Sequence, residues 1–278
     1  MQKPTYAERL QLHREQLAKE RGLDAPEPVQ VPTGGSRSAN EESPQQLASK
    51  LVDAQRKSVD MLTYVKDRVD GLPYEGILAA LEKDGYVVVD DFLANDDVVS
   101  TLETESKALY ESDQMERDIS ELGAGEYTVT LAGGEDQYPV CPRTIEMVVS
   151  VTKNMPSHLK GLDLSSSSCI ASMRTFDRKT KMAASALVVD GKLPDRPFDV
   201  VIDTDTIDTR RVTLYYYPNG SDWDGDGGIT IQENNVRISS KRDRLVLLQS
   251  DSCVHRREYF VGKEDRDVAA CVELHMVS

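Results

Sequence analysis

Hydrophobic positions recur at helical spacing in the first half of the chain. Over residues 43–73 they predict an amphipathic helix whose buried stripe is Leu47, Leu51, Ala54, Leu62, Val65 and Val69. Ser43 and Gln46 form a capping box at its start, and Gly71 and Pro73 follow its end. Further helices are predicted at 74–83, from Asn95 or Asp96 to about Tyr110, and at 144–159.

After Cys169 the hydrophobic period changes towards two, which predicts strands. A strand is also expected at 86–89, and the later ones at 172–176, 182–189, 200–203, 212–217, 229–232, 236–238, 244–249, 256–259 and 267–276. Many short strands joined by turns such as Pro218-Asn219-Gly220 favour a sandwich, barrel or jelly roll. Helices first and strands later is the order of an α+β fold.

The N-terminal region differs in composition from the rest of the chain. Residues 5–21 predict a short amphipathic helix that offers a surface to a protein partner. The segment up to residue 42 is rich in Pro, Gly, Ser and acidic residues, which predicts a disordered linker. We therefore expect three parts: a helix and linker at 1–42, a helical extension at 43–73, and one β-rich domain at 74–278.

Charge and cysteine content exclude several functions. The 48 acidic and 33 basic residues give a net charge of −15, which opposes nucleic acid and anionic membranes as partners. No run of about 18 apolar residues predicts a membrane span, and the N-terminus lacks the apolar core of a signal peptide. The four cysteines show no CxxC spacing, so we expect reduced thiols in a cytoplasmic protein, with the nucleus as an alternative.

Two residues near the C-terminus suggest a binding site. In the last predicted strand, Arg266 shares a face with an apolar row, and a buried guanidinium needs an anion. That anion is either a protein carboxylate or a ligand carboxylate bound in a fork. Eleven residues earlier His255 stands at a strand end, a suitable place for a metal ligand.

Several segments resemble, in order, the prolyl 4-hydroxylase branch of the 2-oxoglutarate and iron(II)-dependent oxygenases. They are GYVVVDDFL, RRVTLYYY, the Gly227-Gly228 turn and RLVLLQ, followed by His255 and Arg266. The resemblance implies a double-stranded β-helix (jelly roll) with N-terminal supporting helices. It also implies that His255 is the distal metal histidine and that Arg266 binds the C5 carboxylate of 2-oxoglutarate. Iron(II) and 2-oxoglutarate would be the cofactor and cosubstrate, with ascorbate left open.

The first metal-binding motif of that family, His-x-Asp, is incomplete here. The corresponding segment, FDVVIDTDTIDTRR, contains no histidine. If Asp203 is the aspartate of the motif, Val201 stands in place of the histidine. If Asp205 is the aspartate, Asp203 becomes the first ligand, and two carboxylates plus His255 suit iron or manganese.

A second motif lies between two predicted strands. Residues 222–233 match the EF-hand calcium loop, with Asp222, Asp224, Asp226 and Glu233 as ligands. The motif requires a flanking helix on each side, whereas strands are expected here. The other interpretation is an acidic connection between strands.

Three functions follow as hypotheses. The first is an iron(II) and 2-oxoglutarate-dependent oxygenase that hydroxylates a peptidyl residue or a small molecule. The second is a catalytically inactive binding protein of the same fold, suggested by the missing histidine. The third is a calcium-binding interaction protein that uses the loop 222–233.

Overall fold

The computed structural model describes residues 59–117, 126–165, 169–176, 210–221, 223, 227–233, 235–258 and 269–278. The chain divides into two compact units, Met1–Ser58 and Val59–Ser278, and every described residue belongs to the second. The fold described below is that of the second unit alone.

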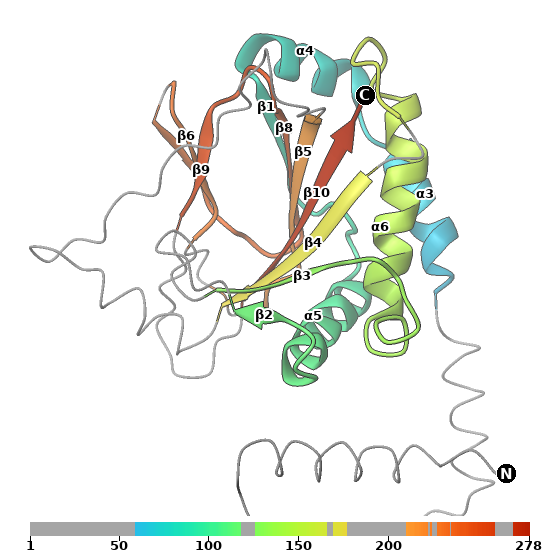
Figure 1. Cartoon of the computed structure of the whole chain (residues 1–278). Helices are drawn as coiled ribbons and strands as arrows, with labels where there is room; N and C mark the ends of the chain where they lie inside the picture. Colours follow the sequence, from blue (N-terminus) through green and yellow to red (C-terminus); the bar gives the residue numbers. More distant parts are fainter. Residues whose placement is uncertain are drawn as a thin grey trace, which may run out of the picture. The chain divides into compact units, whose positions relative to one another are not determined.

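Two antiparallel sheets form the framework of this unit (Figure 1). The large sheet has seven strands in the order β1-β8-β5-β10-β4-β3-β2. Their bounds are Tyr86–Val89 (β1), Glu116–Arg117 (β2), Tyr127–Thr130 (β3), Cys169–Phe176 (β4), Arg210–Tyr217 (β5), Arg244–Gln249 (β8) and Ala269–Val277 (β10). The small sheet has the order β7-β6-β9, with bounds Val236–Ile238, Ile229–Ile231 and His255–Arg257.

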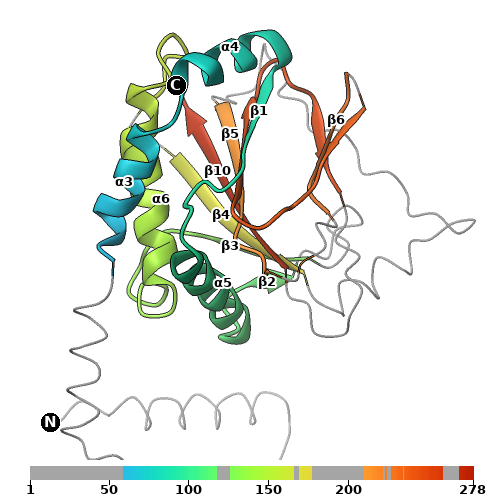
Figure 2. The same ribbon diagram turned by 180° about the vertical axis from the view of Figure 1, so that it is seen from behind.

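Helices cover one face of the large sheet, and the small sheet lies over the other face (Figures 1 and 2). Three helices pack on the covered face: α3 (Met61–Asp70), α5 (Asp96–Glu111) and α6 (Pro142–Asn154), which continues into the 3-10 turn η1 (Met155–Ser157). Helix α4 (Tyr74–Asp84) packs against β1 and β8. None of the described helices is both long and apolar enough to span a bilayer.

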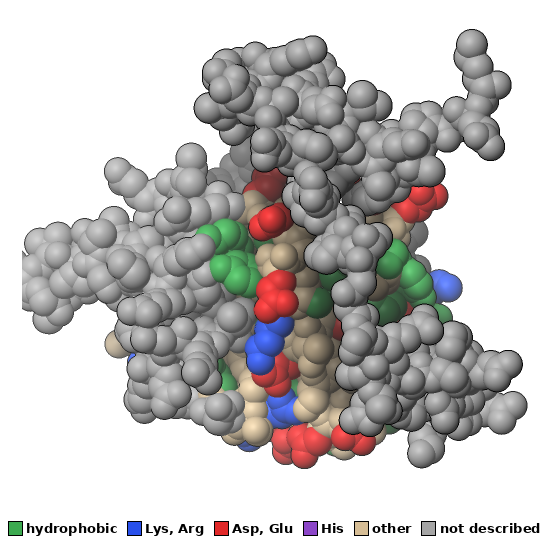
Figure 3. Space-filling model, turned by 90° about the horizontal axis from the view of Figure 1, so that it is seen from below, with side chains coloured by type: hydrophobic (Ala, Val, Ile, Leu, Met, Phe, Trp, Pro, Cys, Tyr) green, Lys and Arg blue, Asp and Glu red, His purple; other side chains and the backbone are tan. Residues whose placement is uncertain are grey.

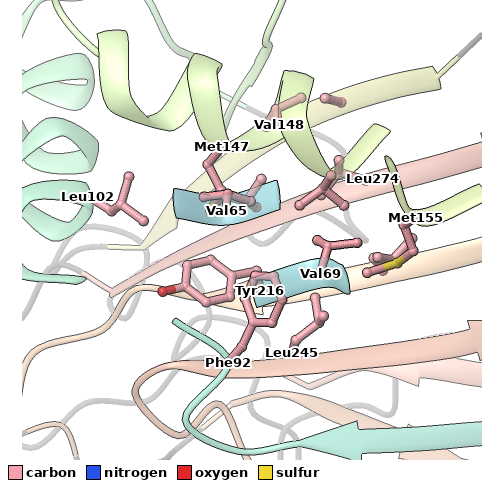
Figure 4. Close-up of a cluster of buried hydrophobic side chains, with 14 of the residues drawn as sticks. Val65, Val69, Phe92, Leu102, Met147, Val148, Met155, Tyr216, Leu245 and Leu274 are labelled. Atoms are coloured by element: carbon pink, nitrogen blue, oxygen red, sulfur yellow. The ribbon is translucent and has the colours of Figure 1, made fainter. Parts of the chain in front are cut away.

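The larger core lies between these helices and the sheet (Figure 4). Val65 and Val69 of α3 point at side chains from the central strands, among them Tyr216, Leu245 and Leu274. All five are at most 1% exposed. Because successive side chains of a strand point to opposite faces, the even-numbered residues of β10 supply this core and the odd-numbered residues face the small sheet.

The buried carboxylate of Asp243, just before β8, holds the segment that follows β1. Asp243 accepts hydrogen bonds from the backbone N–H groups of Leu93 and Ala94 at 2.9 and 2.8 Å, and from the Tyr216 hydroxyl at 3.1 Å. Three donors satisfy an otherwise costly buried acceptor. The segment between β1 and α5 is thereby fixed against the large sheet.

A glycine permits the close approach of two strands in the small sheet. Gly228 has a φ of +97°, and a Cβ there would lie 2.1 Å from the carbonyl oxygen of Ile238. Any side chain would collide with this backbone atom, and an L-residue is strained at that φ. The predicted Gly227-Gly228 turn is therefore required by the β6–β7 pairing.

The described surface carries charges of both signs. On the face seen from below in Figure 3, acidic side chains lie beside Lys and Arg side chains. In α5, Glu103 pairs with Lys107 one turn later, and Arg242 lies 3.4 Å from the same carboxylate. Some acidic side chains are thus paired with basic side chains nearby.

Where the structure describes them, most predicted elements are present with small shifts in their bounds, whereas the predicted helix at 5–21, the linker up to residue 42 and residues 43–58 lie outside the described residues. Helix α3 begins at Met61, inside the region 43–73 where one helix was expected. Asp60 caps it by accepting the Thr63 N–H. Leu62, predicted as buried, is 44% exposed, and the buried stripe runs through Met61, Val65 and Val69. Strands β2 and β3 were not expected, and the predicted strands 182–189 and 200–203 lie outside the described residues.

Candidate metal centre

His255 begins β9 and points from the small sheet towards the large one. It pairs with Ile231 of β6, and its side chain is buried at 3% exposure. Its Nδ1 lies 3.1 Å from the carbonyl oxygen of Cys253, and its Nε2 lies 2.9 Å from the Tyr215 hydroxyl of β5. The site therefore joins the two sheets through one histidine.

The hydrogen-bond partners assign the tautomer of His255. A carbonyl oxygen can only accept, so Nδ1 carries the proton and donates to Cys253. Nε2 lies beside the Tyr215 hydroxyl, whose single proton can go either to this nitrogen or to Glu273 Oε1, 3.2 Å away. Metal-binding histidines have this arrangement, with one ring N–H held by a backbone carbonyl and the other nitrogen directed at the ion.

A buried carboxylate lies beside this pair. Glu273 of β10 is 4% exposed, and its Oε1 is 3.2 Å from the Tyr215 hydroxyl. Its Oε2 accepts from Arg174 Nε of β4 at 2.9 Å, and His275 Nε2 lies 3.3 Å from Oε1. Burial alone raises the pKa of Glu273, but the hydrogen bond from His275 and the charges of Arg257 and Arg174 hold it well below its usual value. Glu273 is therefore an ionised carboxylate in the interior.

A second cation completes the network. Arg257 of β9 lies 3.5 Å from Glu126, a carboxylate that is fully buried. Burial lowers the pKa of Arg257, but Glu273 and Glu126 offset this effect and raise it. Two arginines and two glutamates thus share the interior between the sheets, and each charge has a partner of opposite sign.

The predicted metal and cosubstrate residues are only partly described. His255 is buried between the two sheets, whereas Asp203, Asp205 and Arg266 lie outside the described residues, as does Val201. Among the described residues, no group of three His, Cys, Asp or Glu side chains could hold an ion. A metal bound at His255 would therefore need further ligands from outside the described residues.

The sequence analysis missed Tyr215, Glu273 and His275 as members of the site. His275 lies on the same face of β10 as Glu273 and contacts Thr213 at 3.1 Å. The side chains of Val272 and Leu274, on the opposite face of β10, point towards the helices. A usable signal was present, because a glutamate and a histidine interrupt one face of an otherwise apolar strand.

The loop that matches the calcium motif lies between strands. β5 precedes it, and β6 occupies Ile229–Ile231, within the last part of the pattern. Glu233 is exposed in the following turn, while Asp222, Asp224 and Asp226 lie outside the described residues. Trp223 donates from its indole nitrogen to Ser240 at 2.9 Å. The flanking strands are those expected from the sequence, and they differ from the helices of an EF-hand.

Comparison by sequence finds no matching family profile and no matching curated protein. Solved structures do match. A prolyl 4-hydroxylase from Phytophthora capsici has a TM-score of 0.54 at 21% identity, covering 80% of this chain and 67% of that one. A Pseudomonas putida prolyl-4-hydroxylase has a TM-score of 0.53 at 14% identity, covering 74% and 99%. The chain has the fold of the prolyl 4-hydroxylases.

A prolyl hydroxylase from Trichoplax adhaerens, solved with a peptide fragment of the hypoxia inducible factor oxygen degradation domain, has a TM-score of 0.50 at 15% identity, covering 80% of this chain and 95% of that one. The prolyl 4-hydroxylase fold confirms the expected α+β jelly roll. At these identities the likeness concerns the fold, so the chemistry has to be argued from the residues of this chain.

Proposed function

We propose that this protein is an iron(II) and 2-oxoglutarate-dependent oxygenase that hydroxylates a residue in a peptide, with a small molecule as the alternative substrate. The observation that carries the proposal is His255, a buried histidine between the two sheets of a prolyl 4-hydroxylase fold. Its Nδ1–H is held by a backbone carbonyl, and its Nε2 faces the interior. A peptide is favoured because one structural neighbour was solved with a peptide bound.

His255 and Asp203, with or without Asp205, would hold the metal, and Arg266 would pair with the C5 carboxylate of 2-oxoglutarate. Iron bound there would supply the centre that activates dioxygen. The protein itself fixes the ring of His255 through Cys253 and surrounds it with buried side chains that exclude water. Carboxylate-rich ligand sets suit iron(II) and manganese(II), which accept harder oxygen donors.

The test is an anaerobic titration of the purified protein with iron(II) and 2-oxoglutarate, followed by visible absorbance. We expect a metal-to-cosubstrate charge-transfer band that His255→Ala abolishes. His158→Ala is a matched control, because His158 stacks on Tyr74 and contacts Asp70 rather than the interior network. A parent protein without any band at millimolar metal would refute the proposed function.

A second candidate is a catalytically inactive binding protein of the same fold. The contact between Tyr215 and the Nε2 of His255 favours it, since the metal-facing nitrogen already has a protein partner. Under this alternative, the parent gives no charge-transfer band and Val201→His creates metal binding that the parent lacks. If that variant also binds nothing, Val201 is not the position of the first ligand.

A further inference from the structure

The metal-facing nitrogen of His255 makes a hydrogen bond that competes directly with an ion. An imidazole nitrogen binds a metal through its lone pair at about 2.1 Å. Tyr215 Oη lies 2.9 Å from the same nitrogen. An ion on that lone pair would overlap with the tyrosine oxygen, so the ion and the hydrogen bond exclude each other in this arrangement.

The side chain of Tyr215 is held in the core. It lies on β5 between two neighbouring strands, paired with Val246 of β8 and Glu273 of β10, and it is 1% exposed. Its ring meets that of His255 edge to face, with centroids 5.7 Å apart and planes inclined by 73°. A fully buried side chain on a central strand cannot rotate into solvent, so the contact with His255 is a property of the core.

A second acceptor gives the hydroxyl another place to donate. Glu273 Oε1 lies 3.2 Å from Tyr215 Oη and is ionised, held by Arg174 and His275. If the tyrosine oxygen retreats from His255 towards Glu273, its proton still has a partner and no buried donor is left unsatisfied. The network therefore supplies two arrangements for one hydroxyl.

We propose that Tyr215 is an internal competitor for the metal-binding nitrogen of His255, and that an ion binds only when the hydroxyl gives up His255 and keeps its hydrogen bond to Glu273. This inference takes His255 as the metal ligand of the proposed function. Its consequence is that Tyr215 weakens metal binding in the parent protein. Removing the hydroxyl while keeping the ring should strengthen binding by the worth of one hydrogen bond, about threefold to tenfold.

The experiment is an anaerobic calorimetric titration of the full chain with manganese(II) alone. We compare the parent with Tyr215→Phe and with Tyr217→Phe, which removes a buried hydroxyl from the same face of the same strand. We expect a lower Kd for Tyr215→Phe and an unchanged Kd for Tyr217→Phe. Binding by Tyr215→Phe where the parent shows none would support the inference still more strongly.

Three results would overturn it. Equal Kd values for the parent and Tyr215→Phe would show that Tyr215 does not compete with the metal, and would leave the proposed function intact. Weaker binding by Tyr215→Phe, or a tyrosinate-to-iron(III) charge-transfer band in the oxidised parent, would make Tyr215 a ligand instead. Absence of binding by both proteins at millimolar metal would refute the proposed function together with the inference.

A measurement without metal guards against misfolding of the variant. In the metal-free protein, the ring nitrogen resonances of His255 report the hydrogen bond at Nε2. Tyr215→Phe should shift the Nε2 resonance and leave Nδ1 bonded to Cys253. Unchanged resonances in a folded variant would show that Tyr215 does not bond to His255 in solution.

Discussion

The two faces of the large sheet belong to the same strands but carry different kinds of side chain. On β10, Leu274 packs beneath the helices, whereas its neighbours Glu273 and His275 face the small sheet. The first face is mainly apolar. The second holds ion pairs and the only described histidine that is fully buried. Alternation along one strand thus places an apolar and a charged side chain one residue apart.

The largest loss of stability should come from neutralising Glu273, on the face of β10 that points to the small sheet. Glu273→Gln removes the ion-pair partner of Arg174 and one of the two buried carboxylates that favour the charge of Arg257, and it should cost about 3–5 kcal/mol of unfolding free energy. Chemical denaturation followed by circular dichroism measures it. Glu146→Gln, in an ion pair on α6 that is partly exposed, is the control and should cost at most about 1 kcal/mol. Equal losses in the two variants would mean that the interior charge is solvated.

The adjacent position tests the apolar face. Leu274→Ala opens a cavity under the helices and should cost about 2–5 kcal/mol, again by denaturation. Unlike Glu273→Gln, it should leave the His255 ring resonances unchanged. Leu62→Ala, at a side chain that is 44% exposed, is the matched control and should be nearly neutral. A shift of the His255 resonances in Leu274→Ala would show that the two faces are coupled.

The N-terminal end of α5 tests a region outside the polar network around His255. Asn95 caps α5 by accepting the backbone N–H groups of Asp97 and Val98. Asn95→Ala should therefore cost about 1 kcal/mol and leave manganese binding unaltered. Thermal unfolding and the metal titration check the two halves of this prediction. The control Thr104→Ala removes an exposed hydroxyl from the same helix.

The smallest effect concerns acid stability at the surface. Hydrogen bonds from Arg244 and Lys241 lower the pKa of Asp90 below its ordinary value of 3.8. A lowered folded-state pKa stabilises the protein above the unfolded-state value, and that contribution is lost as pH falls through the folded-state value. Parent and Asp90→Asn should differ slightly in melting temperature at neutral pH and converge on acidification. A difference in melting temperature that grows as the pH falls would contradict this prediction.

Most of the fold was predictable from local patterns. Strands such as Val236–Ile238 and Arg244–Gln249 have the expected bounds, since alternation and turn residues mark them in the sequence. The start of α3 was missed because Asp60 interrupts a hydrophobic stripe that continues at helical spacing on both sides. β3 was missed because three of its four residues are half-buried and the fourth is exposed, on the outer part of the sheet where the pattern is weak.

The site was less predictable than the fold. His255 was found through its place at a strand end and a family resemblance. Its partners Tyr215 and Glu273 come from other strands, and only the pairing register brings them together. Arg266, expected on the same face as the apolar row of the last strand, lies outside the described residues, and the even-numbered apolar side chains of β10 face the helices. In a sheet covered on both sides, each face has its own core.

The strand order has a consequence for synthesis of the chain. β10 follows every other described strand in the sequence, yet it lies in the middle of the large sheet, between β5 and β4. The ribosome must therefore release residues up to Val277 before the two halves of that sheet can join. Until then β4 and β5 present unpaired edges, which are sites of aggregation. Folding of this domain should wait for its final strand, and removal of that strand should prevent folding altogether.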